Sequence, residues 1–339
     1  MNLEIEKKDQ ILYEEIHLRH LNLLVDLKNN HFNNWFFKMA LINTFDDLRV
    51  YIRNLEKNKY KCIIAIKNKK IIGYVYTYPI NNKKTFLKIS SPTIFEEVKY
   101  ISRRELTLNL IRNSITTNNL NTSNWFISSE INNNDLISCS RELGFQPLHE
   151  IILWEKKTFN KDLKFNTYFY EQISKSNIKS FLSFVRSNET IIIRNLLDLD
   201  YSDIYKRTDK FCGMIKNNEG ILLGILKDLS YENKKVYSII RGELWDDELN
   251  NSLSSILQSL SDKAEKIFFK TYSSDKKLND FLSNLNFVEA SQELILVKNT
   301  LIKRVVKEKK QMNKTWENFL GNIDPQGNAY PSPMPLEIK

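Results

Sequence analysis

The sequence has little cysteine, and this limits the kinds of site it can carry. Its three cysteines are Cys62, Cys139 and Cys212, and none belongs to a C-x-x-C pair. Cysteines that lie so far apart, next to predicted strands or on a predicted helix face, are typical of buried thiols, so we expect neither disulfides nor cysteine metal ligands. His17 and His20 have the i, i+3 spacing of a helix face, but no acidic or cysteine cluster accompanies them. We therefore expect no metal site.

Long apolar runs are also missing. No run approaches the roughly 18 apolar residues that a membrane-spanning helix needs, and residues 1–10 are too charged for a secretory signal. We therefore expect a soluble, cytoplasmic protein with no membrane partner. The net charge of +9 comes mostly from lysines scattered along the chain, without a basic stripe interleaved with aromatic residues. For this reason we do not expect a nucleic-acid partner.

The sequence has enough apolar residues for two buried cores. Hydrophobic residues make up 42% and aromatic residues 12% of the 339 residues. A chain of this length exceeds the usual single domain of about 100 to 200 residues. Length and composition therefore favour two domains.

Two stretches share one pattern of helix cap, short amphipathic helix, helix stop and strand. In the first, Gly144 stands where the helix must end, because glycine enters the left-handed conformation without steric cost. In the second, Asn286 has that place, and asparagine is the next-best residue for it. Leu143-Gly144-Phe145 thus corresponds to Leu285-Asn286-Phe287. A period near half the chain length indicates two copies of one domain.

The order of predicted elements in the first copy is distinctive. We predict a strand at 11–18, helical stretches within 21–52, three antiparallel strands at 61–67, 71–79 and 85–90, a helix at 103–115, a strand at 125–128, and then the cap, helix and strand that are repeated in the second copy. This order, with L-G-F between the last helix and the last strand, resembles the GNAT superfamily of acyl-CoA-dependent N-acyltransferases. The resemblance implies a mixed α/β fold.

The fold class that we expect is a mixed sheet with helices, made of two GNAT-like domains in tandem. The first domain covers residues 1–157 and the second, diverged domain covers 165–300, with a charged linker at 158–164. Residues 301–339 form a basic extension that ends in a proline-containing tail, because four of the seven prolines lie there.

The resemblance also predicts where an acyl-CoA would bind. In GNAT enzymes the pyrophosphate lies at the start of the helix after the fourth strand, where backbone N–H groups and a helix N-terminus face it. That segment here, SSPTIFEEVKYISRREL, has none of the usual glycines. Its cations are Lys99, Arg103 and Arg104, and the resemblance assigns them to the phosphates. It assigns the backbone at Ile89 and Ser90 to polarising the thioester carbonyl.

Two asparagines complete the predicted acyl-CoA site. The superfamily commonly has an asparagine touching the cofactor after the strand at 125–128, and Asn133 and Asn134 match that place. Helix capping alone would also account for them. In the second copy, Gly242 is present, but Glu243 and three further acidic residues crowd the same position. Acidic residues repel a diphosphate and favour a helix start, so we expect this copy to be non-catalytic.

The candidate catalytic residues are few. The superfamily often has a tyrosine general acid four residues before the glycine of the L-G-F motif, and Ser140 and Leu282 have that place here. Serine relays a proton only through water, and leucine cannot act. Glu130 is the acid best placed to serve as general base, although packing of Ser140 in its helix and a solvated strand end for Glu130 are simpler explanations. Tyrosines alternate along 74–78 and so share one strand face, where they would line an acceptor pocket.

The sequence supports two functional hypotheses. The first is an N-acyltransferase that uses acetyl-CoA or another acyl-CoA and transfers the acyl group directly to an amine on a small molecule or a protein. The alternative is a catalytically silent GNAT-fold scaffold or regulatory protein. It is supported by the missing glycines and tyrosines and by a tail that carries Trp316, Phe319, Tyr330 and P-S-P-M-P, which would dock to a protein partner.

Overall fold

The computed structural model describes most of residues 11–299. The described residues are 11–20, 22–23, 39–41, 44, 61–95, 102–117, 124–156, 168–228, 231, 234–261 and 266–299. Several predictions lie outside them, namely most of the helical stretches within 21–52, Lys99, the linker and the extension at 301–339. We call the described part of 11–156 the N-terminal half and the described part of 168–299 the C-terminal half.

The two halves have the same succession of elements over most of their length. The N-terminal half consists of β1 (Leu12–Glu15), η1 (Leu18–His20), β2 (Lys61–Lys67), β3 (Lys70–Pro79), β4 (Phe86–Ile89), β5 (Thr93–Ile94), α4 (Arg103–Thr117), β6 (Asn124–Glu130), α5 (Asn134–Glu142) and β7 (Gln146–Lys156). The C-terminal half consists of β8 (Phe169–Gln172), α6 (Ile178–Asn188), α7 (Ile191–Leu197), α8 (Tyr201–Lys206), β9 (Gly213–Lys216), β10 (Ile221–Lys227), β11 (Lys235–Arg241), α9 (Asp247–Ser261), β12 (Ile267–Tyr272), α10 (Lys276–Asn284) and β13 (Phe287–Asn299). The run β9-β10-β11-α9-β12-α10-β13 thus matches β2-β3-β4-α4-β6-α5-β7, apart from the short β5.

The local signals that mark the repeat are present in both halves. Gly144 has φ +86° after α5, and Asn286 has φ +63° after α10, so both predicted left-handed helix stops are confirmed. Both helices also begin with a side-chain cap. The Asn133 side chain accepts the backbone N–H of Leu136 at 3.1 Å, and Asp275 accepts that of Leu278 at 3.3 Å. These matches support the interpretation of two related units.

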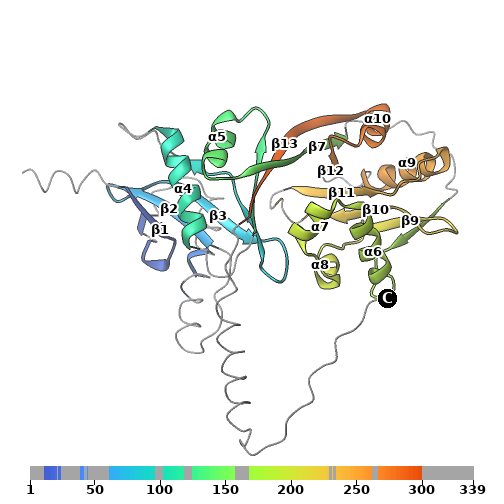
Figure 1. Cartoon of the computed structure of the whole chain (residues 1–339), viewed down its shortest axis with the longest axis horizontal. Coiled ribbons are helices and arrows are strands. Elements are labelled where there is room, and N and C mark those ends of the chain that lie inside the picture. The colour runs from blue at the N-terminus through green and yellow to red at the C-terminus, as the bar shows by residue number, and fades with distance from the viewer. Residues whose placement is uncertain are drawn as a thin grey trace, which may run out of the picture. The chain divides into compact units, whose positions relative to one another are not determined.

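The described strands form one mixed sheet in which the halves exchange their last strands. The order is β1-β2-β3-β4-β6-β13-β7-β12-β11-β10-β9-β8, with β5 beside β3. β13 of the C-terminal half pairs with β6, and β7 of the N-terminal half pairs with β12. β7 and β13 also pair with each other (Figure 1). The mixed α/β fold class is confirmed, and neither half completes its sheet alone.

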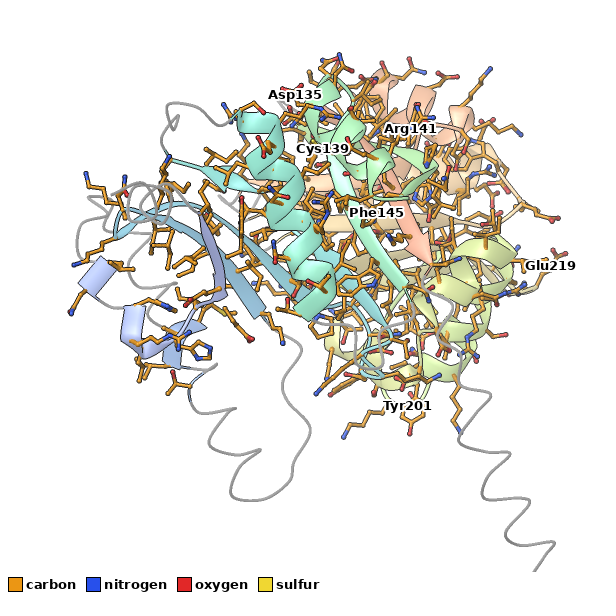
Figure 2. All side chains as sticks on the ribbon, turned by 60° about the vertical axis from the view of Figure 1, so that its left-hand side comes forward. Asp135, Cys139, Arg141, Phe145, Tyr201 and Glu219 are labelled. Carbon is orange, nitrogen blue, oxygen red and sulfur yellow. The ribbon has the colours of Figure 1, made fainter. Side chains whose placement is uncertain are left out.

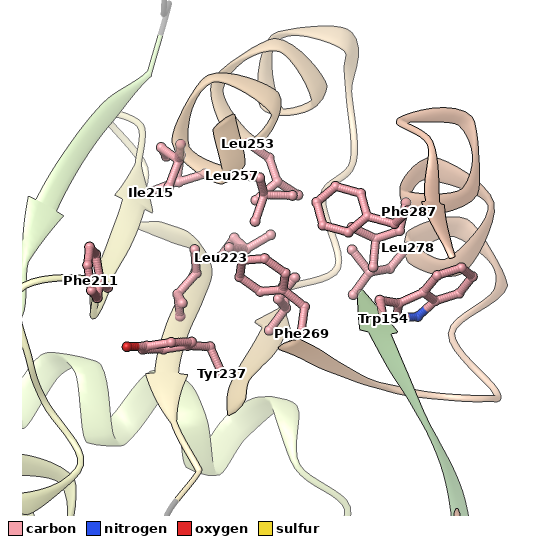
Figure 3. Packing of buried hydrophobic residues seen from close by; sticks show 14 of the residues in the cluster. Trp154, Phe211, Ile215, Leu223, Tyr237, Leu253, Leu257, Phe269, Leu278 and Phe287 are labelled. Carbon is pink, nitrogen blue, oxygen red and sulfur yellow. The ribbon is translucent and has the colours of Figure 1, made fainter. Parts of the chain in front are cut away.

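Each exchanged strand contributes side chains to the hydrophobic core of the other half. Trp154 of β7 is buried against Phe269 and Phe287 in the core beneath α9 and α10 (Figure 3). In return, Leu296 of β13 is fully buried in the core beneath α4 and α5, together with Trp125. Burial of one leucine side chain is worth about 1.5 to 3 kcal/mol. Each half therefore depends on the other for part of its hydrophobic stabilisation.

A second contact between the halves is polar. The turn between β3 and β4 lies against α7 and α8, where the backbone N–H of Asn82 donates to Asp203 at 2.7 Å. Lys83 forms an ion pair with Asp198 at 2.7 Å. The guanidinium of Arg207, which is buried, donates to the Ile80 carbonyl at 3.1 Å. This turn closes one side of the space between the two halves.

Candidate functional site

The parallel strands β4 and β6 separate at their carboxyl ends. Their last paired residues are Ile89 and Ile127. Beyond this pair, the chain leaves β4 for β5, which pairs with β3, while β6 continues beside β13 with Ser128 opposite Ile295. Ser90 and Ser128 are thus the first residues on either side of the separation. We call this place the N-terminal opening.

The C-terminal half has an equivalent separation between β11 and β12. Their last paired residues are Ser238 and Lys270, after which β11 stays with β10 and β12 stays with β7. Here side chains of neighbouring elements form hydrogen bonds with Thr271, a residue that flanks the separation. The indole N–H of Trp154 donates to the Thr271 hydroxyl at 2.9 Å, and that hydroxyl donates to Asn279 at 2.6 Å. We call this place the C-terminal opening.

The helix that follows the N-terminal opening begins with cationic side chains. Arg103 and Arg104 form the first turn of α4, and both are exposed. Arg104 forms an ion pair with Glu142 of α5 at 2.7 Å, so it ties the two helices together. Arg103 forms no ion pair with another described residue. Cys139 adds to the helix contact, since its thiol lies 3.5 Å from the Arg104 carbonyl and α5 lies beside α4 (Figure 2).

The helix that follows the C-terminal opening begins with an anion of the chain itself. Asp246 accepts the backbone N–H of Leu249 at 2.7 Å and the hydroxyl of Tyr168 at 2.8 Å. Gly242 donates its N–H to the Leu222 carbonyl at 2.8 Å, and a Cβ there would lie 3.0 Å from that carbonyl oxygen. The glycine is thus explained by a close contact between strands. The N-terminus of α4 thus carries exposed cationic side chains, whereas the N-terminus of α9 is capped by a carboxylate of the chain.

The other predicted cofactor residues have mostly structural contacts. Ile89 is fully buried in the sheet. The Ser90 N–H donates to the Tyr76 carbonyl at 2.9 Å, and the Ser90 hydroxyl accepts the Tyr76 N–H at 3.1 Å. The Ser90 N–H is therefore already used within the sheet and does not polarise a thioester in this arrangement. Asn133 caps α5, and Asn134 is its exposed first residue.

The two predicted catalytic residues are not brought together. The Ser140 side chain is fully buried, and its hydroxyl donates to the Leu136 carbonyl one turn earlier at 2.7 Å. This contact gives Ser140 a place in helix packing and no path to a leaving group. Glu130 is exposed at the end of β6, opposite Glu293 of β13. Neither residue lines a cavity at the N-terminal opening.

The strand faces around the N-terminal opening have different roles. Leu87 and Ile127 pack against α4 and α5, whereas the alternate residues Lys88 and Ser128 face the opposite side of the sheet. On that side lies an open cavity of about 290 Å³, which we call the tyrosine cavity. Its walls are Tyr74, Tyr76, Tyr78, Lys88, Ser90, Ser91, Thr93, Ser128, Tyr231 and Lys234. The prediction that the three alternating tyrosines share one face is confirmed.

A second, more enclosed cavity of about 110 Å³ lies next to the tyrosine cavity, and we call it the inner cavity. Lys88, Ser128 and Tyr231 line both cavities. The Lys88 ammonium lies 4.9 Å from the centroid of the Tyr231 ring and 5.4 Å from that of Phe126. Residues of both halves form the walls of the inner cavity, so it exists only because the strands are exchanged.

Polar groups gather at the β12 side of the inner cavity. The Tyr272 hydroxyl donates to both carboxylate oxygens of Glu189, at 3.0 and 2.9 Å. The ring of His149 meets the Tyr272 ring edge-on at 4.8 Å, and its Nδ1 is buried without a hydrogen-bond partner. Burial and the nearby Lys270 ammonium lower the pKa of His149 to about 4, so its imidazole is neutral at pH 7. Lys270 forms an ion pair with Asp228.

Sequence reasoning did not single out Glu189, Tyr272 or His149. Glu189 follows α6 and His149 lies on β7, so these residues meet only through the exchanged strands. The one signal in the sequence is that Tyr272 is the last residue of an apolar stretch, which forms β12. Alone, a tyrosine at a strand end is too common to mark a site.

Comparisons with known proteins give a fold and no close relative. No protein-family model matches the chain, and no curated protein matches it in sequence. A solved structure of a fungal multi-domain GH3 beta-N-acetylglucosaminidase, described as having a GCN5-related glucosamine N-acetyltransferase region, is similar with a TM-score of 0.52 and 10% identity. The similarity covers 86% of this chain and 38% of that one. This chain has a GNAT fold.

Other structures with the GNAT fold are similar at a lower level. A GCN5-related N-acetyltransferase from Sphaerobacter thermophilus has a TM-score of 0.49 and 7% identity, over 75% of this chain and 84% of that one. A putative acetyltransferase from Pyrococcus horikoshii has a TM-score of 0.48 and 8% identity, over 87% and 92%. Among the described residues, no helix is long and apolar enough to cross a membrane, and no group of three potential metal ligands occurs.

Proposed function

We propose that the chain is an acyl-CoA-dependent N-acyltransferase that transfers an acyl group directly to an amine at the N-terminal opening. The observation that carries the proposal is the separation of β4 and β6 beyond Ile89 and Ile127, with two cavities on the face away from α4. An acyl-CoA, such as acetyl-CoA, would supply the activated acyl group. The acceptor, a small molecule or an amine of a protein, would approach through the cavities. A cytoplasmic location remains part of this proposal.

Residues of the N-terminal half would hold the acyl-CoA. Arg103 at the first turn of α4 offers a guanidinium without an ion pair among the described residues, and Lys99 from the preceding segment is proposed to add a second cation. Arg104 is already paired with Glu142, so we assign it mainly to the contact between α4 and α5. We assign Asn133 and Asn134 to the cofactor only because they lie at the start of α5, which packs against α4.

Ser128 is the residue of the chain that we assign to the reacting carbonyl. Its hydroxyl makes no hydrogen bond to another described residue, and it lines both cavities at the opening. A hydroxyl donor at this place would stabilise negative charge that develops on the carbonyl oxygen during amine attack. Ser140 and Glu130 are not assigned a step, because Ser140 bonds within α5 and Glu130 lies outside the cavities.

The first experiment is a calorimetric titration of acetyl-CoA into the full chain. We expect micromolar binding, and we expect R103A to weaken it roughly tenfold, since hydrogen bonds to charged groups are worth about 1.5 to 3 kcal/mol. R112A is the matched control, because Arg112 is exposed on the same helix but two turns away from its start. The absence of heat and of a thermal shift at millimolar acetyl-CoA would refute the proposal.

The alternative function is a catalytically silent scaffold that binds a partner protein. The occupied C-terminal opening and the acidic start of α9 favour this reading for the C-terminal half. If the N-terminal half also fails to bind acetyl-CoA, the extension at 301–339 is the segment to test for a protein partner. We assign the C-terminal half no acyl-CoA site under either function.

A further inference from the structure

The carboxylate of Glu189 is a half-buried anion in the wall of the inner cavity. Glu189 follows α6 and lines the inner cavity, where its oxygens accept hydrogen bonds from Tyr272. No ion pair joins Glu189 to any other residue that the structure describes. Burial raises the pKa of this carboxyl group, against the opposing effects of the Tyr272 hydrogen bond and the Lys270 charge. A half-buried carboxylate without an ion pair is a binding group for a cation.

The cations nearest to Glu189 are engaged by other anions. Lys270 on β12 forms its ion pair with Asp228. Arg207, which follows α8, is fully buried, and its charge interacts favourably with those of Asp228 and Asp203. His149 on β7 is neutral at pH 7. Lys270 therefore acts on Glu189 only through its charge, and no described residue forms an ion pair with Glu189.

The remaining cations of the wall belong to more distant strands. Lys88 lies on β4, four strand spacings from the β12 strand that carries Tyr272, and Lys227 lies on β10, two spacings from it. At about 4.8 Å per spacing, this corresponds to roughly 19 and 10 Å between the strands. Tyr231, the other titratable residue of the wall, donates its hydroxyl to Glu293 at 2.9 Å and stays neutral, because burial raises its pKa.

His149 provides a second polar contact point. Its Nδ1 is buried without a partner, and its ring touches the ring of Tyr272, whose hydroxyl binds Glu189. A primary ammonium group has three N–H donors. One can be accepted by the Glu189 carboxylate and another by the unprotonated nitrogen of the imidazole. A neutral hydroxyl ligand would satisfy the same geometry without using the charge.

Much of the remaining wall is apolar, and the cavity is small. Aliphatic side chains from α6, from α7 and from the segment after α7 cover the cavity: Val185, Ile193, Leu196, Leu197 and Leu199. Phe86 and Phe126, whose rings stack at 5.0 Å, close the side formed by the N-terminal half. The volume of about 110 Å³ is somewhat below the roughly 150 Å³ of an apolar cavity that binds benzene. The wall therefore suits an apolar body of about five carbon atoms.

We propose that the inner cavity binds a small primary amine with an apolar body as its cation, and that the Glu189 carboxylate holds the ammonium group. This inference goes beyond the proposed function, because the ammonium group would lie at β12, three strand spacings or roughly 14 Å from the β6 strand that carries Ser128. Binding of the amine itself needs no acyl-CoA, so the two proposals fail separately.

The test is a calorimetric titration of the full chain with n-pentylamine and, separately, with 1-pentanol, without acyl-CoA. The two probes have similar shapes, and only the amine is charged at pH 7. We expect pentylamine to bind at least tenfold more tightly. E189Q keeps the shape and an acceptor for the Tyr272 hydroxyl, and it should abolish this preference. E219Q should not, because Glu219 is exposed in the turn before β10 and points into solvent (Figure 2).

Two outcomes would overturn the proposal. One is equal binding of pentylamine and pentanol, and the other is an amine preference that survives in E189Q. A measurement on the unaltered chain guards against misfolding of the variant. As the pH falls through the raised pKa of Glu189, pentylamine should lose affinity while pentanol keeps it. Amine binding that persists without any acetyl-CoA binding would refute the acyltransferase and leave the amine site in place.

Discussion

The N-terminal and C-terminal openings have the same strand geometry but different flanking side chains. Ser90 and Ser128 flank the first and line the tyrosine cavity, whereas Ile239 and Thr271 flank the second and line the inner cavity. Ile239 is buried, and Thr271 is bonded on both sides by side chains of neighbouring elements. Both halves therefore have the same backbone arrangement, but neighbouring side chains hold the residue that flanks the second opening in place. The comparison teaches that a repeated fold does not repeat a site.

The helices that follow the two openings also differ in the charged residues at their N-termini. α4 begins with two arginines, and α9 begins with Asp247 and Glu248 after the capping Asp246. A helix N-terminus attracts an anion in both cases. The first turn of α4 also holds Glu105, but Arg103 there has no ion-pair partner among the described residues, and we propose that it binds a phosphate group. In α9 the chain supplies the anion itself.

The largest expected effect comes from separating the halves. A fragment of residues 1–160 lacks β13, so β6 and β7 lose the strand between them and the core beneath α4 loses Leu296. We expect this fragment to show no cooperative thermal unfolding by circular dichroism, whereas residues 1–300 unfold cooperatively. A fragment 1–160 that melts cooperatively and binds acetyl-CoA would show that the exchange is dispensable.

A smaller effect is expected from the pH dependence of His149, which comes from the N-terminal half but senses Lys270 of the C-terminal half. Its folded-state pKa of about 4 lies below the ordinary 6.5. The unfolded chain therefore binds the proton first, and stability is lost as the pH falls from about 6.5 to 4. The shift corresponds to about 3 kcal/mol of unfolding free energy.

Urea denaturation at several pH values tests this expectation. H149Q should remove most of the decline between pH 6.5 and 4. The raised pKa of Glu189 acts in the opposite sense, because the folded state then holds a proton that the unfolded state releases, and stability rises as the pH falls toward 4.5. E189Q should therefore steepen the decline. If H149Q and the unaltered chain have the same slope, His149 does not have a lowered pKa.

The next effect contrasts the two openings directly. W154F removes the bond to Thr271 in the C-terminal opening, and we expect it to lower the unfolding free energy by about 1 to 2 kcal/mol and to leave acetyl-CoA binding unchanged. S128A in the N-terminal opening should change stability by less than about 0.5 kcal/mol and lower the transfer rate roughly a hundredfold. Denaturation curves and acyl-transfer rates measure both. Equal consequences for rate from both variants would contradict the contrast.

The fold could be predicted from local signals, and the exchange could not. The helix stops at Gly144 and Asn286, and the caps before α5 and α10, are decided by residues a few positions apart, so a single sequence contains them. Which sheet β7 and β13 join is decided by pairing over more than a hundred residues. Apolar strands such as Ile151 to Trp154 carry no mark of their partner, because any neighbouring strand would bury them.

The candidate site, too, could be predicted from the sequence only in part. The three alternating tyrosines and the cationic start of α4 follow from strand and helix periodicity, and the structure places the tyrosines on one cavity wall. The roles suggested for Ser90 and Ser140 came from the resemblance, and local hydrogen bonds occupy both residues. Glu189 was not predicted, because its meeting with Tyr272 depends on the tertiary arrangement of α6 against the exchanged strands.

The smallest effect is expected from a substitution that changes only the charge at the start of α9. D247R gives α9 the cationic first turn that α4 has, at an exposed position. If charge at the helix start were the only difference between the halves, this variant would gain a second acetyl-CoA site. We expect no second site by calorimetry and a loss of stability below about 1 kcal/mol, because the positive side chain opposes the helix dipole. The pairing of Trp154 and Asn279 with Thr271 still occupies the C-terminal opening, so a stoichiometry that rises from one to two would mean that the charge at the helix start, and not the occupied opening, excludes an acyl-CoA from this half.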